Sequence, residues 1–426
     1  MIFMFRIYSF LFLIVFDFQI LYCQKESITL DSCLIWAQNN YPMIKQLDLV
    51  KRTESFSLSN IATAWFPQIN VTGQASYQSD VTGFKIAIPG INLPEPPSKE
   101  QYKFYADFGQ LVYAGGSIIA QKNLVRSNTK LEILKLEVEF YKINDRILQL
   151  YFGSILIQEQ LQIVDLIDKD LIAQIKKAEA ALESQIIASS TLYQLQAESI
   201  KARQKRIELE SQQNQMLKLL GQFINKELPI NTAFIVPKER SLRQQIDRSE
   251  LWLSDQQVVF VENQWRLSRS KVIPKLSLFG QIGYANPALN FLKNEFQAYY
   301  VAGIRLNWNF SSLYSFKNDY QISILNKNIA ALQKETFLFN TRLNLLQQEE
   351  EIHKFEILLK SDLELVELRT KIKVAAKVQW ESGVITVSDY IRELNAEEQA
   401  RTNQTVHQIQ FLQAQYLHYY HSGIKL

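Results

Sequence analysis

The segment PQINVTGQASY, Pro67–Tyr77, has a counterpart in PKLSLFGQIGY, Pro274–Tyr284, which begins 207 positions further along the chain. Several residues of the first copy recur in order in the second: Pro67, Gly73, Gln74 and Tyr77 recur as Pro274, Gly280, Gln281 and Tyr284. Chance would rarely preserve such an order, so the repeated segment indicates an internal duplication.

Both copies alternate between apolar and polar side chains, which is the period of a β-strand. In the first copy one face is apolar and the other fully polar, with Gln68, Asn70, Thr72, Gln74, Ser76 and Gln78 on the polar side. Two interpretations stay open at this point. The strands belong either to a small soluble sandwich or to a membrane barrel, whose strands have about 9–11 residues and aromatic side chains near their ends.

A second alternating stretch follows each copy, namely QYKFYADFGQLVY (101–113) and QAYYVAGIRLNWNF (297–310). The first stretch has Gln110 as an exception on its apolar face. The second carries Arg305, Asn307 and Asn309 on its polar face. Each half of the chain therefore offers one strand pair. Four strands cannot close a membrane barrel, because the smallest known barrels have eight, so several chains would have to contribute.

Between the strand pairs the period becomes helical. Residues 117–183 contain no proline and one glycine, and Leu134, Tyr141, Leu148 and Ile155 recur every seven residues, as in a coiled-coil seam. Such a helix would be roughly 100 Å long. A compact globule of this chain length has a radius of gyration of only about 22 Å, so the sequence predicts an elongated protein.

The second half repeats this order. A helical stretch is followed by the break ESGVITVSDY, which matches ESQIIASSTLY 198 positions earlier. The sequence thus predicts a signal peptide (1–23), a first repeat (24–229) and a second repeat (230–426). The first repeat has predicted strands at about 67–78 and 102–113 and helices at about 29–66, 115–184 and 189–221. The second has predicted strands at about 274–285 and 298–310 and helices at about 240–272, 315–382 and 386–422.

Composition and termini narrow the class of protein. The net charge is only +3 and the basic residues are spread along the chain, which argues against nucleic-acid binding. Arg6 precedes an apolar run, as in a secretory signal, and the run is too short for a membrane-spanning helix. Cys23 either leaves with the signal or becomes a lipidated first residue, an option that the large Tyr22 before it disfavours. Cys33 would then be the one thiol left after cleavage at Cys23.

The ordered motifs resemble those of the TolC family of outer-membrane efflux proteins, over nearly all of residues 28–423. ITLDSCLIWAQNNYPMIK, from Ile28, resembles the family's N-terminal signature, and DRSELWLSDQ resembles its equivalent in the second repeat. QLVYAGG, at 110–116, resembles the exit from strand to helix, whereas its partner LNWNFSSLYS lacks the glycine pair. LKLLGQ and YLHYYHSG resemble the ends of the returning helices.

The resemblance implies a fold, a location and partners. We expect a mainly α protein with a membrane β-barrel: a homotrimer in which each chain gives four strands to one twelve-stranded barrel in the outer membrane, while the helices form a periplasmic barrel. It would be a passive exit duct of a tripartite efflux pump or a type I secretion system, working with a periplasmic adaptor and an inner-membrane pump, and no cofactor is expected. The polar strand faces would line the lumen, through Gln68, Asn70, Thr72, Gln74, Arg305, Asn307 and Asn309.

The resemblance also places a gate at the periplasmic tip, in the turns 185–193 and 383–392. The family's two acidic positions lie six and nine residues after the glycine of the second turn. Asp389 fits the first position, counted from Gly383, but Arg392 occupies the second, so a double acidic ring is in doubt. A contact between Asp389 and Arg392 is a possible substitute, and solvated turn residues are the alternative. Gln185 and Ser190 are the candidate residues of the first turn.

Enzymatic interpretations find little support in the sequence. Glu350 and His353 form a single E-x-x-H motif, whereas a di-iron bundle needs two such motifs and further carboxylates. No phosphate-binding glycine loop or nucleophile motif is recognisable. The rival from another class is a poreless trimeric scaffold or adhesin stalk, against which the paired strands of alternating polarity argue.

Overall fold

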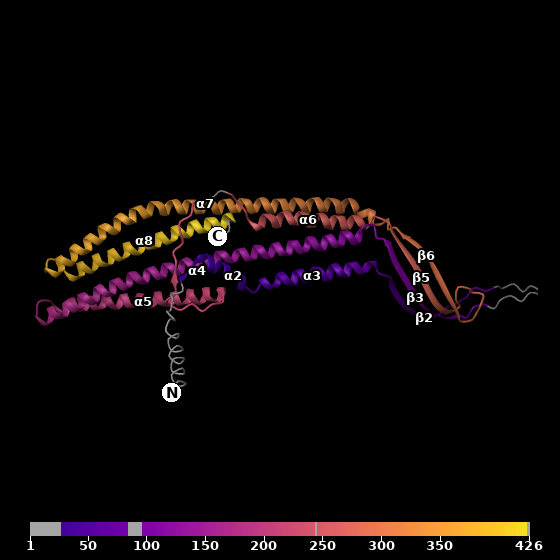
Figure 1. Cartoon of the computed structure of the whole chain (residues 1–426), viewed down its shortest axis with the longest axis horizontal. Coiled ribbons are helices and arrows are strands. Elements are labelled where there is room, and N and C mark those ends of the chain that lie inside the picture. The colour runs from indigo at the N-terminus through magenta and orange to yellow at the C-terminus, as the bar shows by residue number, and fades with distance from the viewer. Residues whose placement is uncertain (1–26, 84–95, 243–244, 424–426) are drawn as a thin grey trace, which may run out of the picture. The chain divides into compact units, whose positions relative to one another are not determined.

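The computed structural model describes residues 27–83, 96–242 and 245–423. Helices make up most of these residues, so the predicted mainly α class is confirmed. In chain order the elements are β1 (Ser27–Ile28), α2 (Leu30–Asn40), α3 (Ile44–Ala62), η1 (Thr63–Trp65), β2 (Gln68–Tyr77), β3 (Glu100–Tyr113), α4 (Ser117–Glu183), α5 (Ser189–Ile224), β4 (Ala233–Phe234), α6 (Ser249–Ser270), β5 (Lys275–Asn286), β6 (Gln297–Asn307), α7 (Ser312–Glu381) and α8 (Val387–Ser422) (Figure 1).

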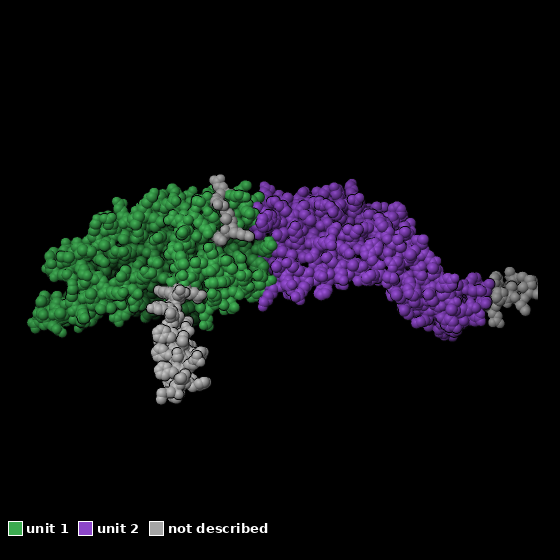
Figure 2. Space-filling model, viewed as in Figure 1, with its two compact units in different colours: residues 1–44, 137–248, 338–426 green, residues 45–136, 249–337 purple. Residues whose placement is uncertain are grey.

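The chain divides into two compact units (Figure 2). Unit 1 comprises residues 1–44, 137–248 and 338–426, and unit 2 comprises residues 45–136 and 249–337. Each unit takes segments from both halves of the sequence, so the predicted repeat boundary at 229/230 stays a prediction. None of the helices that the structure describes is long and apolar enough to cross a lipid bilayer.

Unit 2 contains one antiparallel sheet in the order β2-β3-β5-β6, and these strands lie side by side in Figure 1. The registers bring like residues together across the strands: Ile69 pairs with Phe108, and Asn70 pairs with Asp107. The register between β3 and β5 shifts at Leu111–Tyr113. The shift lies beside Gln110, the exception in the alternation, whose side-chain amide donates to the Trp65 carbonyl at 2.8 Å.

Unit 1 is built from α2, the parallel pair β1–β4 and two helical hairpins, which α5 and α8 form with the parts of α4 and α7 from residues 137 and 338 onward. Its core surrounds Tyr151, which is fully buried and donates its hydroxyl to the carbonyls of Ile28 and Ile235. Leu148 and Ile155 of the predicted seam are also buried in this core. Burial raises the pKa of Cys33 to about 12, so this thiol stays protonated and unreactive at neutral pH.

Several predicted boundaries need correction. The helix expected over 29–66 is interrupted after Asn40, because Tyr41 precedes Pro42 and takes an extended conformation. The helix expected from about 240 begins only at Ser249, and the strand expected to reach 310 ends at Asn307. The predicted signal peptide, Cys23 and the middle of the first strand-pair loop lie outside the described residues.

Candidate functional site

The sheet of unit 2 has one polar face, which gathers most of the strand residues predicted for the lumen. Gln68, Asn70 and Gln74 of β2 are exposed and Thr72 is half-buried. The register aligns Gln74 with Lys103 and Thr72 with Tyr105. Further along the same face the Gln281 amide donates to Asp107 at 2.8 Å. Polar side chains of β2, β3 and β5 therefore lie together on this face, which also carries Phe279 and Val301 between β5 and β6.

The opposite face of the sheet is apolar and stays exposed in the single chain. Its side chains keep large exposed fractions, for example 64% for Val71, 63% for Phe104, 61% for Ile282 and 69% for Ile304. A soluble sandwich would bury this face against a second layer. An uncovered apolar face on a strand pattern of this length is instead what a lipid-facing barrel wall requires.

Arg305 and Asn307 lie on the polar face of β6, whereas Asn309 does not belong to the strand. The Arg305 guanidinium lies 4.6 Å from the centre of the Phe279 ring. Gly303 pairs with Phe279, and the Phe279 ring occupies the space that a side chain at position 303 would need. Asn309 follows β6, and its side-chain oxygen accepts hydrogen bonds from the Ser311 amide and hydroxyl just before α7. Its predicted place on the strand is therefore corrected to the connection between β6 and α7, and its lumenal role stays a prediction.

The two predicted tip turns have the same backbone structure in unit 1. The Ile186 amide donates to the Ala181 carbonyl and the Gln185 amide to Leu182, and the same bonds form 198 positions later, from Val384 to Gln379 and from Gly383 to Trp380. This is the Schellman closure of a helix C-terminus, which needs one residue at positive φ. Gly383 meets the need with φ 72°, and Gln185 adopts φ 58° despite its side chain.

Asp389 lies in the first turn of α8 and caps the N-terminus of this helix. Its carboxylate accepts from the Thr386 amide and hydroxyl, while the Thr386 hydroxyl accepts from the Asp389 amide, so the two residues form a capping box. The expected contact is present, because Arg392 Nη1 lies 3.4 Å from Asp389 Oδ1. The Thr386 hydrogen bonds, with a smaller contribution from Arg392, hold the pKa of Asp389 below its usual value. Its role in a gate stays a prediction.

The serines near the turns differ in their contacts. Ser190 is exposed on the first turn of α5. Its counterpart Ser388 lies 3.2 Å from the Gln194 side-chain oxygen and links α8 to α5. A second exposed link joins the hairpins through Lys177 and Glu381, at 2.8 Å.

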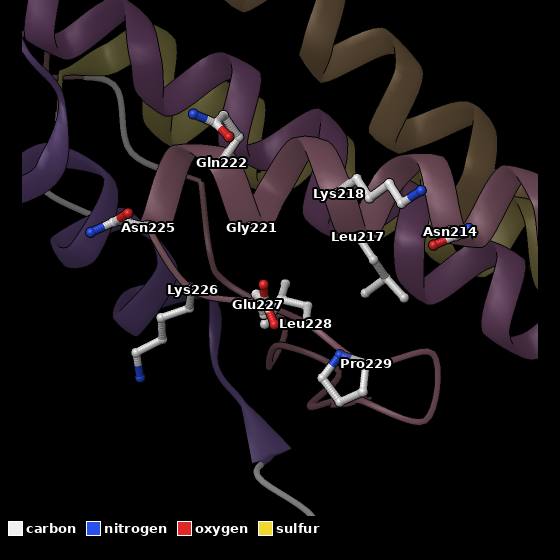
Figure 3. Close-up of a pocket in the computed structure, with 10 residues that line it drawn as sticks. All are labelled: Asn214, Leu217, Lys218, Gly221, Gln222, Asn225, Lys226, Glu227, Leu228 and Pro229. Carbon is white, nitrogen blue, oxygen red and sulfur yellow. The ribbon is translucent and has the colours of Figure 1, made fainter.

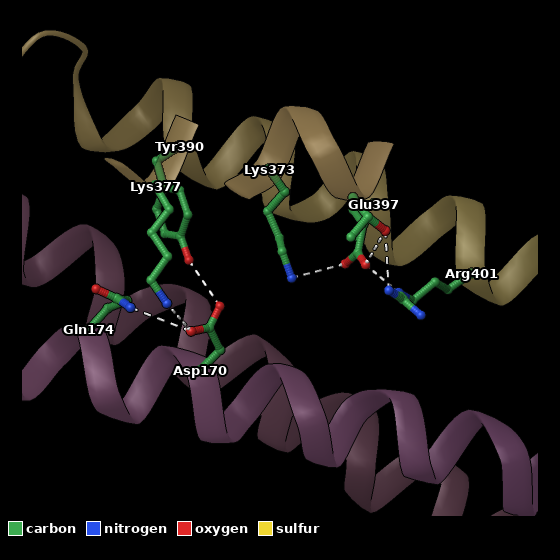
Figure 4. Close-up of polar contacts among 8 residues, drawn as sticks. Asp170, Gln174, Lys373, Lys377, Tyr390, Glu397 and Arg401 are labelled. Atoms are coloured by element: carbon green, nitrogen blue, oxygen red, sulfur yellow. Dashed lines mark hydrogen bonds and ion pairs between the residues drawn. The ribbon is translucent and has the colours of Figure 1, made fainter. Parts of the chain in front are cut away.

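A half-buried polar contact between the two hairpins was not predicted from the sequence (Figure 4). The Asp170 carboxylate of α4 accepts a hydrogen bond from Lys377 Nζ of α7, at 2.7 Å. It accepts a second one from the hydroxyl of Tyr390 of α8, at 3.1 Å. Burial opposes ionisation of Asp170, but Lys377, with Gln174 and Tyr390, outweighs it and holds the pKa of Asp170 below its usual value. Burial, followed by the Asp170 charge, raises the pKa of Tyr390, which therefore remains a donor.

A second charged cluster lies nearby and is also visible in Figure 4. The Glu397 side chain is 4% exposed and is paired with Arg401 and, at 3.5 Å, with Lys373. Both clusters line a hollow of about 380 Å³ between α4, α7 and α8. Because a buried charge is costly unless paired, Glu397 requires its partners Arg401 and Lys373, and the Lys373 pair joins α7 to α8 at this level of unit 1.

A larger open hollow of about 860 Å³ lies beside the end of α5 (Figure 3). Asn225 takes a left-handed conformation there, and the chain returns so closely over Gly221 that a Cβ would lie 2.5 Å from the Lys226 carbonyl oxygen. The residues that line this hollow include Lys218, Lys226 and Glu227.

His353 of the predicted half-motif Glu350–His353 is exposed, and its Nδ1 lies 3.9 Å from Glu356 of the same helix. Within the described parts of the chain, no group of three or more His, Cys, Asp or Glu residues is arranged to hold a metal ion.

The fold is that of the outer-membrane channel proteins. The chain is similar to the Campylobacter jejuni CmeC outer membrane channel, with 14% identity, a TM-score of 0.68 and coverage of 93% of this chain and 86% of that one. It is similar to the outer membrane protein VceC of Vibrio cholerae, with 10% identity, a TM-score of 0.67 and coverage of 92% and 96%.

A third similar structure is the open state of the Neisseria gonorrhoeae MtrE outer membrane channel, with 10% identity, a TM-score of 0.66 and coverage of 93% and 89%. No family model and no curated protein matches the sequence. The resemblance thus lies in the architecture, because identity has fallen to a level at which the fold alone is informative.

Proposed function

We propose that the protein is a passive exit duct of the outer membrane, formed by three copies of the chain. The observation that carries the proposal is the four-stranded sheet with one polar face, one exposed apolar face and two outer strands, β2 and β6, that each pair on one side only. Exposed apolar surface is stable in lipid, and unpaired strand edges are not, so this sheet needs both a membrane and neighbouring strands.

The proposed duct exports solutes that an inner-membrane pump delivers through a periplasmic adaptor. The similar structures named above are outer-membrane channels, which supports this assignment. The duct itself supplies no energy and no catalysis. Efflux of small molecules and type I secretion of proteins both remain within the proposal.

The decisive experiment combines electrophysiology with a count of chains. The full-length protein is extracted from membranes in detergent, reconstituted in a planar bilayer and cross-linked in a parallel sample. A cross-linked trimer with discrete current steps is the expected result. A water-soluble protein that produces no current steps would instead favour a poreless scaffold of the cell envelope.

A further inference from the structure

The polar face of the sheet carries an unequal set of charges. Three basic residues and one acidic residue point to this face from the four strands, so each chain contributes a net of two positive charges: Lys103, Lys275 and Arg305 against Asp107. The apolar face carries only Glu100, at the end of β3. The imbalance therefore belongs to the polar face and not to the sheet as a whole.

The basic residues are also more available to solutes than the acid. Lys103, Lys275 and Arg305 are exposed, and none of them forms an ion pair within the described part of the chain. Asp107 is half-buried, and its carboxylate is held by the Gln281 amide. The solvent at this face consequently meets three cations that form no ion pair in the described part of the chain, one of them stacked on Phe279, and one partly shielded carboxylate.

Two of the cations are neighbours. Lys275 pairs with Asn307 and Ser277 pairs with Arg305, so Lys275 and Arg305 are diagonal neighbours on adjacent strands. Diagonal side chains on one face lie about 7–8 Å apart, which is within one Debye length at about 0.1 M salt. Their fields therefore add at one end of the sheet.

We propose that the pore lined by this face passes anions in preference to cations. The inference rests on the proposed function, because it takes the polar face to be the lumen wall. Fixed positive charges raise the local concentration of anions and repel cations, and a pore wall of low dielectric focuses the field. Cargo with phosphate, sulfonate or carboxylate groups would benefit from the same wall.

The experiment measures the reversal potential of the purified full-length channel in a gradient of potassium chloride. The expected permeability ratio of chloride to potassium is above one. The ratio should rise as the salt falls from about 1 M to about 0.1 M, because the Debye length grows from about 3 Å to about 10 Å.

Charge-neutralising variants locate the effect. Lys275→Gln combined with Arg305→Gln should lower the permeability ratio, and Asp107→Asn should raise it. Glu100→Gln is the matched control, because it removes a carboxylate from the opposite face of the same strand as Asp107. This control should leave the ratio unchanged.

The outcomes separate this inference from the proposed function. Discrete channels that prefer potassium would overturn the anion preference and leave the duct intact. So would a chloride-to-potassium permeability ratio that is the same in the original protein and in the double variant. Absence of channels would overturn the duct and the inference with it.

Discussion

Gln185 and Gly383 occupy the same position in two turns whose hydrogen bonds match. A positive φ is costly for a residue with a Cβ and nearly free for glycine. No atom outside the chain neighbours lies within 4 Å of a Cβ built at Gly383, so the cost there is one of backbone conformation alone.

Substituting each residue by the other should raise the local stability of the first turn and lower that of the second. We expect Gln185→Gly to stabilise the first turn and Gly383→Gln to destabilise the second, each by about 1 kcal/mol. Hydrogen exchange at the Ile186 and Val384 amides measures the effect. Equal exchange rates in the variants and the original protein would show that neither turn is limited by its φ angle.

The charges near the second turn can be separated from its hydrogen bonds. A carboxylate at the tip of the proposed duct would bind Mg²⁺ and allow this ion to block the channel. Asp389→Asn removes the carboxylate charge and should weaken that block, whereas Arg392→Gln uncovers the charge and should strengthen the block. The expected change is about two- to fivefold in blocking concentration, the size of an exposed ion pair. Single-channel current under added Mg²⁺ provides the measurement.

Thr386→Ala is the control for these substitutions, because it breaks the capping box and keeps both charges. An equal loss of Mg²⁺ block in Thr386→Ala would attribute the effect to the cap. Block that stays the same in all three variants would remove Asp389 and Arg392 from the gate.

At the scale of elements, Asp170 ties α4 to both α7 and α8. Asp170→Asn keeps the shape but loses the charge that holds Lys377, and we expect it to weaken the contact by about 1 kcal/mol, discounted for partial exposure. The open probability of the reconstituted channel should rise. Lys177→Met is the matched control, since its pair with Glu381 also joins the hairpins but is exposed. A larger effect in the control than in Asp170→Asn would contradict this account.

The contact between Asp170 and Lys377 makes the packing of the two hairpins depend on pH, and the lowered pKa of Asp170 gives the direction of that dependence. The pKa of Asp170 is lowered in the folded protein, so its stabilisation is fully present above the ordinary aspartate value of about 3.9. It is lost as the pH falls through the lowered pKa. Open probability in the original protein should therefore approach that of Asp170→Asn only in strong acid, and a rise already at pH 6 would assign the effect to another group.

The strands and long helices could be predicted because their signals are local. Alternation at Ile69, Asn70 and Val71 depends on near neighbours in the chain, as do the seams of α4. The Asp170 contact could not be predicted in this way, because its partners lie 207 and 220 positions away and meet only when two hairpins pack. Asn309 was misplaced because the alternation continues past the last paired residue of β6, where a side chain takes over the hydrogen bonding.

At the scale of the whole molecule, neighbouring residues of β2 should respond oppositely to the same substitution. Val71→Lys places a charge on the apolar face and should cost about 2–4 kcal/mol at the middle of a bilayer. Thr72→Lys places it on the polar face and should be tolerated. The yield of membrane-extracted trimer measures both, and equal yields would contradict the assignment of the two faces.

The two outer strands of the sheet, β2 and β6, bear on whether a mutant allele is dominant or recessive. In the proposed assembly of three chains, each edge pairs with a neighbouring copy, so a chain with an altered edge that still assembles would impair the whole assembly. With random mixing of equal doses of sound and faulty chains, only about one assembly in eight contains three sound copies. Alleles altered in β2 or β6 should therefore be dominant, whereas an allele that prevents its product from being made should be recessive.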